Sequence, residues 1–280
     1  MTELAGTTTD STTSAPLEAG REVFVEFIDV HKSYGRKSVL RGANLKVYRG
    51  EVLVILGGSG SGKSVTLRHI LGLEHPDEGE IIVDGEEITG LREEDLFRVR
   101  MKFGMLFQSG ALFDSMSVLE NIAFPLRAHT DATEDDIRRI VGEKLALVDL
   151  AGTEALMPVD LSGGMRKRVG LARSIVMEPE AILYDEPTTG LDPITAETIN
   201  ELMVGLQTKL HVTSVVVTHD IQSAFFVGDR IAFLNDGVFE WVGTMDEARD
   251  SDHPELRAFF KSSNVSAAQP TTERRRRRED

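Results

Sequence analysis

One glycine-rich loop constrains this chain more than any other feature. Residues 57–64 read GGSGSGKS, which fits the pattern G-x-x-x-x-G-K-[ST], with Lys63 and Ser64 completing it. A continuous apolar run of strand length, EVLVIL at 51–56, precedes the loop, and the KSVTLRHIL that follows is typical of a helix. Strand, loop and helix in this order predict a phosphate-binding site at the positive end of a helix.

The composition of the loop explains how it would hold phosphate groups. Glycine lets the backbone bend so that successive N–H groups face inward. Lys63 would reach the β- and γ-phosphates of a nucleotide, and the hydroxyl of Ser64 would ligate Mg²⁺. A glycine-rich turn that matches by chance is the alternative, and the flanking strand and helix disfavour it. The residues expected to contact the nucleotide are Gly57, Gly58, Ser59, Gly60, Ser61, Gly62, Lys63 and Ser64.

Two adjacent carboxylates end a second buried strand. AILYDE at 181–186 places Asp185 and Glu186 side by side, where like charges repel and each needs its own explanation. Asp185 would hold Mg²⁺ through its water shell, and Glu186 would orient and deprotonate the water that attacks the γ-phosphate. Alone, such a pair before Pro187 favours a solvated turn. Its position about 120 residues after a P-loop favours the catalytic interpretation.

Three further segments complete an ordered set of motifs. Ser162, Gly163 and Gly164 begin a helical stretch, so free N–H groups and the helix dipole would face an anion that nothing local supplies. Gln108 follows the strand-like run KFGMLF, and His219 follows the buried-strand pattern TSVVVT. Taken singly, each has an ordinary explanation: an N-cap serine, a loop glutamine and a structural histidine. The ordered set favours function.

Alternating strand and helix patterns predict an α/β fold with a mainly parallel sheet and phosphate chemistry at the strand carboxyl ends. An antiparallel β region is expected first, with apolar runs from VFVEFIDV to IIVDG at 81–85. Residues 109–177 are expected to form a helical subdomain inserted in the core. Within it, 133–150 carries a Thr-x-x-Asp capping pattern and apolar residues at helical spacing. From Ala181 the alternation resumes, with a helix that starts at Pro193.

Composition narrows the class of protein. The 280 residues can bury one large core, and 41% apolar content is ordinary for a soluble globular protein. No apolar stretch approaches the ~18 residues of a membrane span, and the lack of cysteine excludes disulfides and thiolate metal sites. A formal charge of −15 argues against nucleic acid as a partner. The domain is expected over 23–262, between a disordered leader at 1–22 and a disordered tail at 263–280 that carries the basic run Arg274 to Arg278.

Over about 23–260 the ordered set resembles the nucleotide-binding domain of ATP-binding cassette (ABC) transporters. GGSGSGKS matches the Walker A motif, Gln108 the Q-loop, LSGGM the family signature, ILYDE the Walker B motif and His219 the switch histidine. The resemblance implies ATP and Mg²⁺ as cofactors, a stacking contact between Tyr34 and adenine, and a D-loop that ends at Asp192. It also implies that Gln108 senses Mg²⁺ and the attacking water.

The resemblance also implies partners. The anion that faces Ser162 would be the γ-phosphate of ATP on a second copy of the chain, so two copies would pair head to tail around nucleotide. The apolar stretch after Gln108 would receive a coupling helix from a separate integral membrane permease. The chain would then lie as a peripheral subunit on the cytoplasmic face of the inner membrane.

Met165 at the end of LSGGM, and DPIT at 192–195, resemble the Mce/Mla class of ABC ATPases. That class powers lipid transport, with phospholipid as the expected cargo and an Mce-domain lipid-binding protein as a further partner. Three alternatives are weighed. The first is the ATPase of a small-solute, amino-acid-type importer, and the second is a non-transport ABC ATPase, which usually carries a second cassette or long coiled coils. The third, a P-loop kinase or GTPase, would leave Gln108 and His219 without a role.

Overall fold

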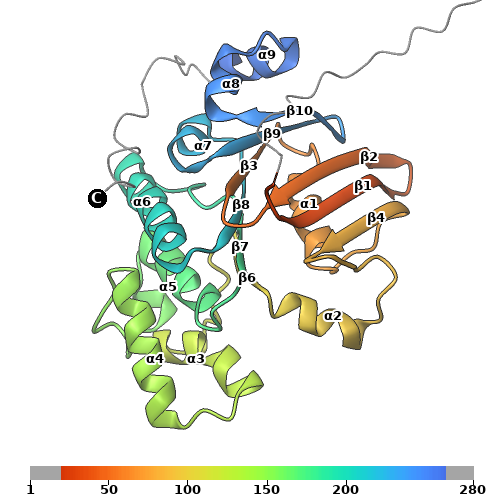
Figure 1. Ribbon diagram of the computed structural model, residues 1–280. Coiled ribbons are helices and arrows are strands. Elements are labelled where there is room, and N and C mark those ends of the chain that lie inside the picture. Colours follow the sequence, from red (N-terminus) through yellow and green to blue (C-terminus); the bar gives the residue numbers. More distant parts are fainter. Residues whose placement is uncertain (1–19, 263–280) are drawn as a thin grey trace, which may run out of the picture.

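The computed structural model describes residues 20–262, which build two sheets and a set of helices (Figure 1). The tail expected at 263–280 lies outside the described residues, as does the leader expected at 1–22 except for Gly20, Arg21 and Glu22. Within the described part of the chain, no helix is long and apolar enough to cross a membrane.

A mainly parallel sheet forms the centre of the molecule. Its strands are β3 (Val52–Leu56), β6 (Phe103–Leu106), β7 (Ala181–Asp185), β8 (Thr213–Thr218), β9 (Arg230–Asn235) and β10 (Val238–Thr244). Their order across the sheet is β10-β9-β3-β8-β7-β6, and only β10 is antiparallel to its neighbour. Because helices and a second sheet cover its two faces, β3 is apolar at every position rather than alternating, and all six residues of β8 are buried although Thr213, Ser214 and Thr218 are polar. This confirms the fold class predicted from the sequence.

The central sheet separates two hydrophobic clusters, because successive side chains of a strand point to opposite faces. In β3, Val54 and Leu56 pack with the helices, whereas Leu53 and Ile55 pack towards the second sheet. All four side chains are fully buried. The strand that leads into the glycine-rich loop is therefore anchored from both sides.

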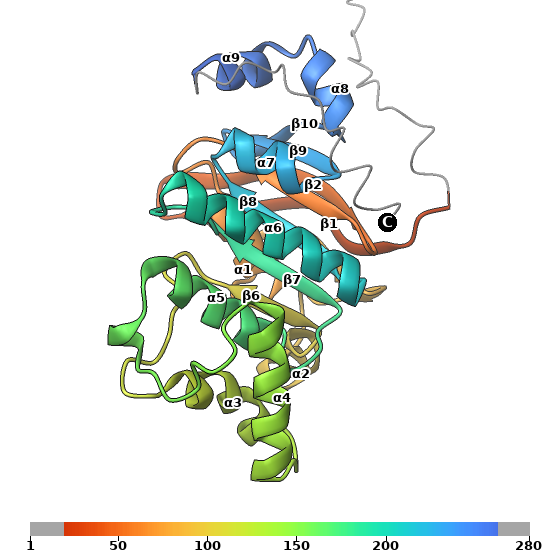
Figure 2. The same cartoon turned by 90° about the vertical axis from the view of Figure 1, so that its left-hand side faces the viewer.

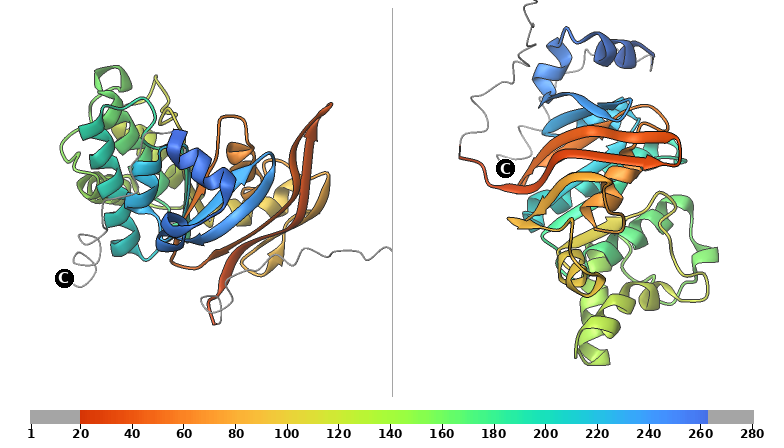
Figure 3. Two further views of the ribbon diagram at one scale, coloured as in Figure 1. Left: turned by 90° about the horizontal axis from the view of Figure 1, so that it is seen from above. Right: turned by 90° about the vertical axis from the view of Figure 1, so that its right-hand side faces the viewer.

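The second sheet is antiparallel and comes mostly from the amino-terminal part of the chain. Its strands are β1 (Val23–Tyr34), β2 (Lys37–Tyr48), β4 (Glu78–Val83) and β5 (Glu86–Glu87), in the order β2-β1-β4-β5. Helix α1 (Lys63–Ile70) lies between the two sheets, and Leu67 and Ile70 pack into their shared core (Figure 1). Viewed from above, the antiparallel sheet forms a layer on the side opposite to most of the helices (Figure 3).

The remaining helices differ in where they lie on the central sheet. Their bounds are α2 (Glu93–Arg100), α3 (Val118–His129), α4 (Glu134–Leu147), the 3₁₀ turn η1 (Pro158–Asp160), α5 (Gly163–Ser174), α6 (Pro193–Leu210), α7 (Ile221–Val227), α8 (Met245–Asp250) and α9 (Pro254–Ser262). Helices α3, α4 and α5 gather at one end of the central sheet, and α8 and α9 lie at the other (Figures 1 and 2). Helix α6 runs across the sheet between these groups (Figure 2).

Local signals explain where these helices begin and end. Thr133 caps α4 by accepting the N–H of Asp136 at 3.2 Å, as the Thr-x-x-Asp pattern predicts. The helix expected over 133–150 stops at Leu147, because Asp149 adopts a left-handed backbone with φ of 55°. Helix α6 starts at Pro193 as predicted.

The short helix α9 packs on the core of its own chain. Leu256 and Phe260 are buried, and the rings of Phe260 and Phe225 lie 5.6 Å apart. Helix α2 and the two-residue strand β5 were not predicted, because neither carries a periodic pattern long enough to recognise.

Candidate nucleotide-binding site

Four of the predicted motifs meet along one edge of the central sheet. Strands β3, β8, β7 and β6 are consecutive neighbours and run in parallel, so their carboxyl ends share that edge. Gly57 follows β3, His219 follows β8, Glu186 follows β7 and Gln108 follows soon after β6. Motifs that lie up to 162 residues apart in the sequence are thereby brought to four adjacent strand ends.

The glycine-rich loop turns tightly between β3 and α1. Gly62 adopts φ of 111°, a conformation that L side chains rarely adopt, and a Cβ on Gly57 would clash with the carbonyl oxygen of Leu234. Lys63 folds back over the loop and donates to the carbonyls of Gly57 at 2.9 Å and Gly58 at 3.0 Å. The loop is thus held in a compact curve beneath a buried ammonium group.

Burial and two carboxylates act in opposite directions on Lys63. The pKa of its amine is lowered, because burial outweighs the attraction of Glu186 and Asp185. The Nζ atom lies 3.7 Å from Oε1 of Glu186. An anionic ligand in the loop would add a further negative partner to this buried ammonium group and so favour its charged form.

Ser64 and Asp185 form a pair of oxygen donors beside the loop. The Ser64 hydroxyl donates to Oδ1 of Asp185 at 2.9 Å. Burial and the neighbouring Glu186 raise the pKa of Asp185, against the effect of that hydrogen bond. Within residues 20–262 no group of three or more His, Cys, Asp or Glu could hold a metal. The pair fits Mg²⁺, which proteins commonly bind through one carboxylate and substrate phosphates.

Glu186 is the most constrained residue of the site. Its N–H donates to Val217 at 2.9 Å, and its Oε2 accepts from Thr189 at 2.9 Å and lies 2.8 Å from Nδ1 of His219. Its backbone is left-handed, with φ of 50°, which is uncommon for a side chain of this kind. Such a backbone persists only where the surroundings fix it. Its carboxylate therefore has a defined position beside Lys63.

Gln108 lines a pocket at the edge of the sheet. The pocket, of about 490 Å³, lies between the loop after β6 and the turn after β7. Gln108 and Asp185 are both part of its wall, so the structure brings these two predicted residues together. Its lining residues are Phe107, Gln108, Ser109, Asp185, Thr189 and Gly190.

Tyr34 ends β1, in the hairpin that approaches the glycine-rich loop. Tyr34 pairs with Lys37 across the turn of this hairpin. The Nζ atom of Lys37 would lie 3.9 Å from a Cβ placed on Gly60 of the loop. The Tyr34 ring is 44% exposed and its hydroxyl donates to Glu74. Burial and this bond to Glu74 raise the pKa of the Tyr34 hydroxyl. The exposed ring can therefore offer a stacking surface near the loop.

The predicted residues Ser162, Gly163 and Gly164 lie at the start of α5. Ser162 caps α5 by accepting the N–H of Met165 at 3.2 Å. A Cβ on Gly163 would lie 3.6 Å from Leu191, and one on Gly164 would clash with Thr195. The signature segment therefore packs beside the turn that leads into α6.

Asp192 begins that same helix. Its carboxylate accepts the N–H groups of Ile194 and Thr195, each at 3.1 Å, and bonds with the Thr195 hydroxyl lower its pKa. Among the described residues, no hydrogen bond or ion pair joins Ser162 or Asp192 to the loop at 57–64.

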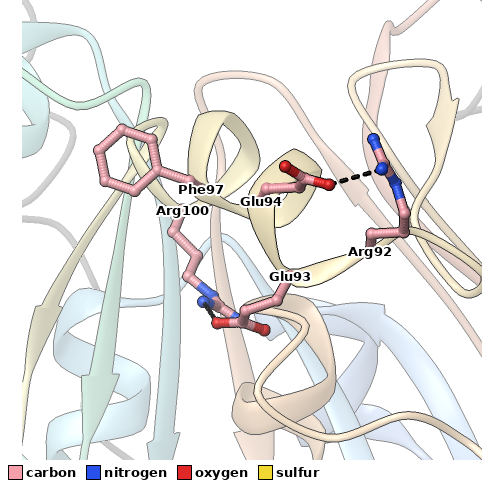
Figure 4. Close-up of a pocket in the computed structure, with 5 residues that line it drawn as sticks. All are labelled: Arg92, Glu93, Glu94, Phe97 and Arg100. Atoms are coloured by element: carbon pink, nitrogen blue, oxygen red, sulfur yellow. Dashed lines mark hydrogen bonds and ion pairs between the residues drawn. The ribbon is translucent and has the colours of Figure 1, made fainter.

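A larger pocket on α2 has no chemistry of this kind. It measures about 620 Å³ and is lined by Arg92, Glu93, Glu94, Phe97 and Arg100 (Figure 4). Arg92 pairs with Glu94 at 2.5 Å, and Arg100 pairs with Glu93. Because these charges are paired with each other, the sheet edge is the better candidate site.

Sequence reasoning missed two residues that hold the Glu186 turn. Thr189 donates to the carboxylate of Glu186, and Lys167 of α5 donates to the backbone carbonyls of Glu186 and Pro187. A threonine in DEPTTG could have been suspected from its closeness in sequence. Lys167 gave no signal, because a lysine on an amphipathic helix is normally exposed.

Comparison with known proteins agrees with this geometry. The model of the family described as "ABC transporter" matches residues 40–189. The chain belongs to this family. It is an ATPase of the cassette type. A solved ATP-binding cassette, a dimer in a post-hydrolysis state with ADP and Pi, is 36% identical with a TM-score of 0.73. The match covers 79% of this chain and 98% of that one.

Curated relatives refine the comparison. The "Probable ribonucleotide transport ATP-binding protein mkl" of Mycobacterium tuberculosis is 42% identical, over 87% of this chain and 68% of that protein. The "Intermembrane phospholipid transport system ATP-binding protein MlaF" of Escherichia coli is 40% identical, over 84% and 88%. The chloroplastic protein TRIGALACTOSYLDIACYLGLYCEROL 3 of Arabidopsis thaliana is 40% identical, over 88% and 76%.

Proposed function

We propose that two copies of this chain clasp ATP between them and that its hydrolysis powers lipid transport through a separate membrane permease. The main support for this proposal is that the predicted residues fall into two groups within one chain. The P-loop contacts Asp185 and Glu186, whereas the signature segment at 162–164 packs beside the start of α6, and we take these two groups as the halves of a site. A head-to-tail pair of chains would complete two sites.

Each residue then has a role in binding. The N–H groups of the loop at 57–64 and the ammonium of Lys63 would hold the phosphates. Ser64 and Asp185 would hold Mg²⁺, which when bound neutralises charge on the phosphate oxygens. Tyr34 would stack on adenine. Ser162 and the first N–H groups of α5 would meet the γ-phosphate of the partner's ATP.

Glu186 would carry the chemistry by accepting a proton from the attacking water. The turn around it leaves its Oε2 bound to Thr189 and His219, so the carboxylate is oriented before substrate arrives. His219 would contact the γ-phosphate and keep Glu186 in register, and Gln108 would respond to Mg²⁺ and water. Asp192 would act across the dimer interface beside the signature.

The surface after Gln108 suits a membrane partner. Phe113 and Phe124 are 45% and 44% exposed, and their rings lie 5.2 Å apart. A pair of exposed aromatic side chains in contact is typical of an interaction surface. We assign it to the permease, which would place the chain on the cytoplasmic face of the inner membrane.

Two relatives support the assignment of lipid as the cargo, because one is named for phospholipid transport and the other for a galactolipid. We therefore propose phospholipid as the cargo and an Mce-domain protein as a further subunit. The name of the mycobacterial relative gives ribonucleotide transport instead. Nucleotides are thus a competing cargo that an experiment must test.

The test is to isolate the assembly with gentle detergent and reconstitute it in vesicles. We expect mass spectrometry to find a permease and an Mce-domain protein, and ATP to drive movement of fluorescent phospholipid between membranes. The Glu186→Gln assembly is the matched control. Recovery of a periplasmic solute-binding protein, or ATP-driven uptake of labelled amino acid or ribonucleotide without lipid movement, would overturn the assignment.

A further inference from the structure

Lys167 is a buried cation on the inner face of α5. Its residue is 4% exposed, and its Nζ donates to the carbonyl oxygens of Pro187 at 2.7 Å and Glu186 at 3.1 Å. Burial lowers the pKa of its amine to about 8, against the attraction of Glu186 and Asp185. Within residues 20–262 it has no carboxylate within 4 Å, so backbone carbonyls are its ligands. Burial of an ammonium at this place needs a reason beyond packing.

The carbonyl groups that Lys167 binds belong to the turn after β7, which holds Glu186 in an uncommon backbone conformation. Glu186 has a left-handed backbone, and the neighbouring proline restricts the conformation of the residue before it. The amide of Glu186 is held by β8, and its carboxylate by Thr189 and His219. Lys167 holds the remaining side of this turn, its carbonyl oxygens. The glutamate is thus tied to α5 as well as to the sheet.

Helix α5 also begins at the signature. Ser162 is its N-cap, and Lys167 lies five residues further along, so about 7.5 Å of helix separates them. The helix is pressed against the loop after β6, since a Cβ on Gly170 would lie 3.0 Å from the carbonyl oxygen of Gly110. Arg173 donates to that same carbonyl at 3.0 Å. A shift of α5 must therefore move the loops at both strand ends.

We propose that Lys167 is a positioning residue that ties the Glu186 turn to the helix that begins at Ser162. The inference rests on the proposed ATP-clasping dimer. In that dimer, Ser162 of one chain meets the ATP of its partner, while Glu186 of the same chain serves its own ATP. Docking of the signature on one ATP then sets the glutamate at the other, which links the two sites through a single helix.

The first test replaces Lys167 in the full chain within its assembly. Lys167→Met keeps an unbranched side chain and removes the donors, and we expect kcat for ATP to fall at least about tenfold. The KM for ATP and the affinity for a fluorescent ATP analogue should change less than about twofold, since no phosphate contact is lost. Lys144→Met is the matched control, because Lys144 is also buried but pairs with Glu178 away from the site.

Lys167→Gln keeps one N–H donor without the charge and should give an intermediate kcat. It replaces the methionine variant if that variant does not fold. A kcat of either folded variant within about twofold of wild type, or an equal loss of ATP affinity and kcat, would overturn the proposal.

Mixed dimers distinguish two explanations for a slow Lys167→Met variant: misplacement of Glu186 in the same chain, or damage to the signature segment that faces the partner's ATP. In one arrangement Glu186→Gln and Lys167→Met are on different chains, so the remaining glutamate lacks its lysine. In the other, both changes are on one chain, and the remaining glutamate keeps it. We expect single-turnover phosphate release to be at least about tenfold slower in the first arrangement, with Glu186→Gln paired with wild type as the reference.

Equal rates in the two arrangements, or a slower second arrangement, would overturn the tie between Lys167 and its own chain's glutamate. A wild-type assembly that releases no phosphate would contradict the proposed function itself. If wild type is active and both Lys167 variants are fully active, the role of Lys167 is wrong and the proposed function is unaffected.

Discussion

The imidazole of His219 holds the carboxylate of Glu186, with 2.8 Å between Nδ1 and Oε2. The two side chains differ in exposure, at 59% for the histidine and 13% for the glutamate. An exposed ring therefore orients a mostly buried carboxylate. This relationship places a candidate base and its orienting group together at the ends of β7 and β8, and it motivates the first prediction.

Glu186→Gln should bind ATP normally but hydrolyse it at least about 100-fold more slowly, because an amide cannot accept the proton of the attacking water. Nucleotide-bound dimers should then accumulate, as size-exclusion chromatography with ATP can measure. Glu178→Gln is a matched control, since Glu178 also has a left-handed backbone, with φ of 53°, but lies on the surface. Hydrolysis by Glu186→Gln at the wild-type rate would remove Glu186 from its role.

Lys63→Ala should weaken binding of ATP by about 10–100-fold, because a charge-assisted bond to phosphate is lost. Isothermal titration with the isolated chain gives the affinity directly. Lys46→Ala is the control, since that lysine is half exposed on β2 and pairs with Glu26. Equal affinities for ATP in the two variants would exclude Lys63 from the site.

Ser64→Ala should raise the Mg²⁺ concentration needed for half-maximal hydrolysis by about tenfold, because one of two protein oxygen donors is removed. Titration of ATPase activity with MgCl₂ after chelation by EDTA measures this. Saturating Mg²⁺ should restore much of the rate. An unchanged Mg²⁺ requirement would show that Ser64 does not take part in metal binding.

The strand ends of the site could be predicted because each motif follows a local apolar run. The run at 51–56 and the run before Asp185 both form strands where expected, β3 and β7. Their adjacency to β8 is a long-range pairing that no local pattern encodes. The roles of the individual residues at these strand ends stay predictions.

Two features that the sequence could not predict depend on contacts or backbone conformations that the apolar pattern does not encode. Lys167 reaches carbonyls 19 and 20 residues away, and the pattern of α5 gives no reason to bury it. The end of α4 at Leu147 depends on a single left-handed residue, Asp149, in a stretch that otherwise continues the helical spacing. The first feature follows from tertiary packing and the second from local backbone conformation, and the spacing of apolar side chains reports neither.

Gly104→Ala should lower the free energy of unfolding by about 1–3 kcal/mol, because its Cβ would clash with the backbone carbonyl of Ser174 where α5 crosses β6. Each lost kcal/mol should reduce Tm by roughly 2–4 °C in a domain of this size. Gly142→Ala is the control, since no heavy atom lies within 4 Å of its Cβ in α4. That variant should gain up to about 1 kcal/mol from helix propensity. Thermal unfolding in which Gly104→Ala is as stable as Gly142→Ala would contradict the close approach.

Ser162→Asp tests the two-chain site without removing the helix cap. Aspartate caps a helix as well as serine does, so α5 and Tm should be preserved. Its carboxylate would face the γ-phosphate of the partner's ATP, and we expect repulsion to abolish hydrolysis while a single chain still binds ATP. Ser162→Asn keeps both the cap and neutrality and should retain most activity. Full turnover by Ser162→Asp would mean that no phosphate approaches the start of α5, and two copies would then have to meet by another surface.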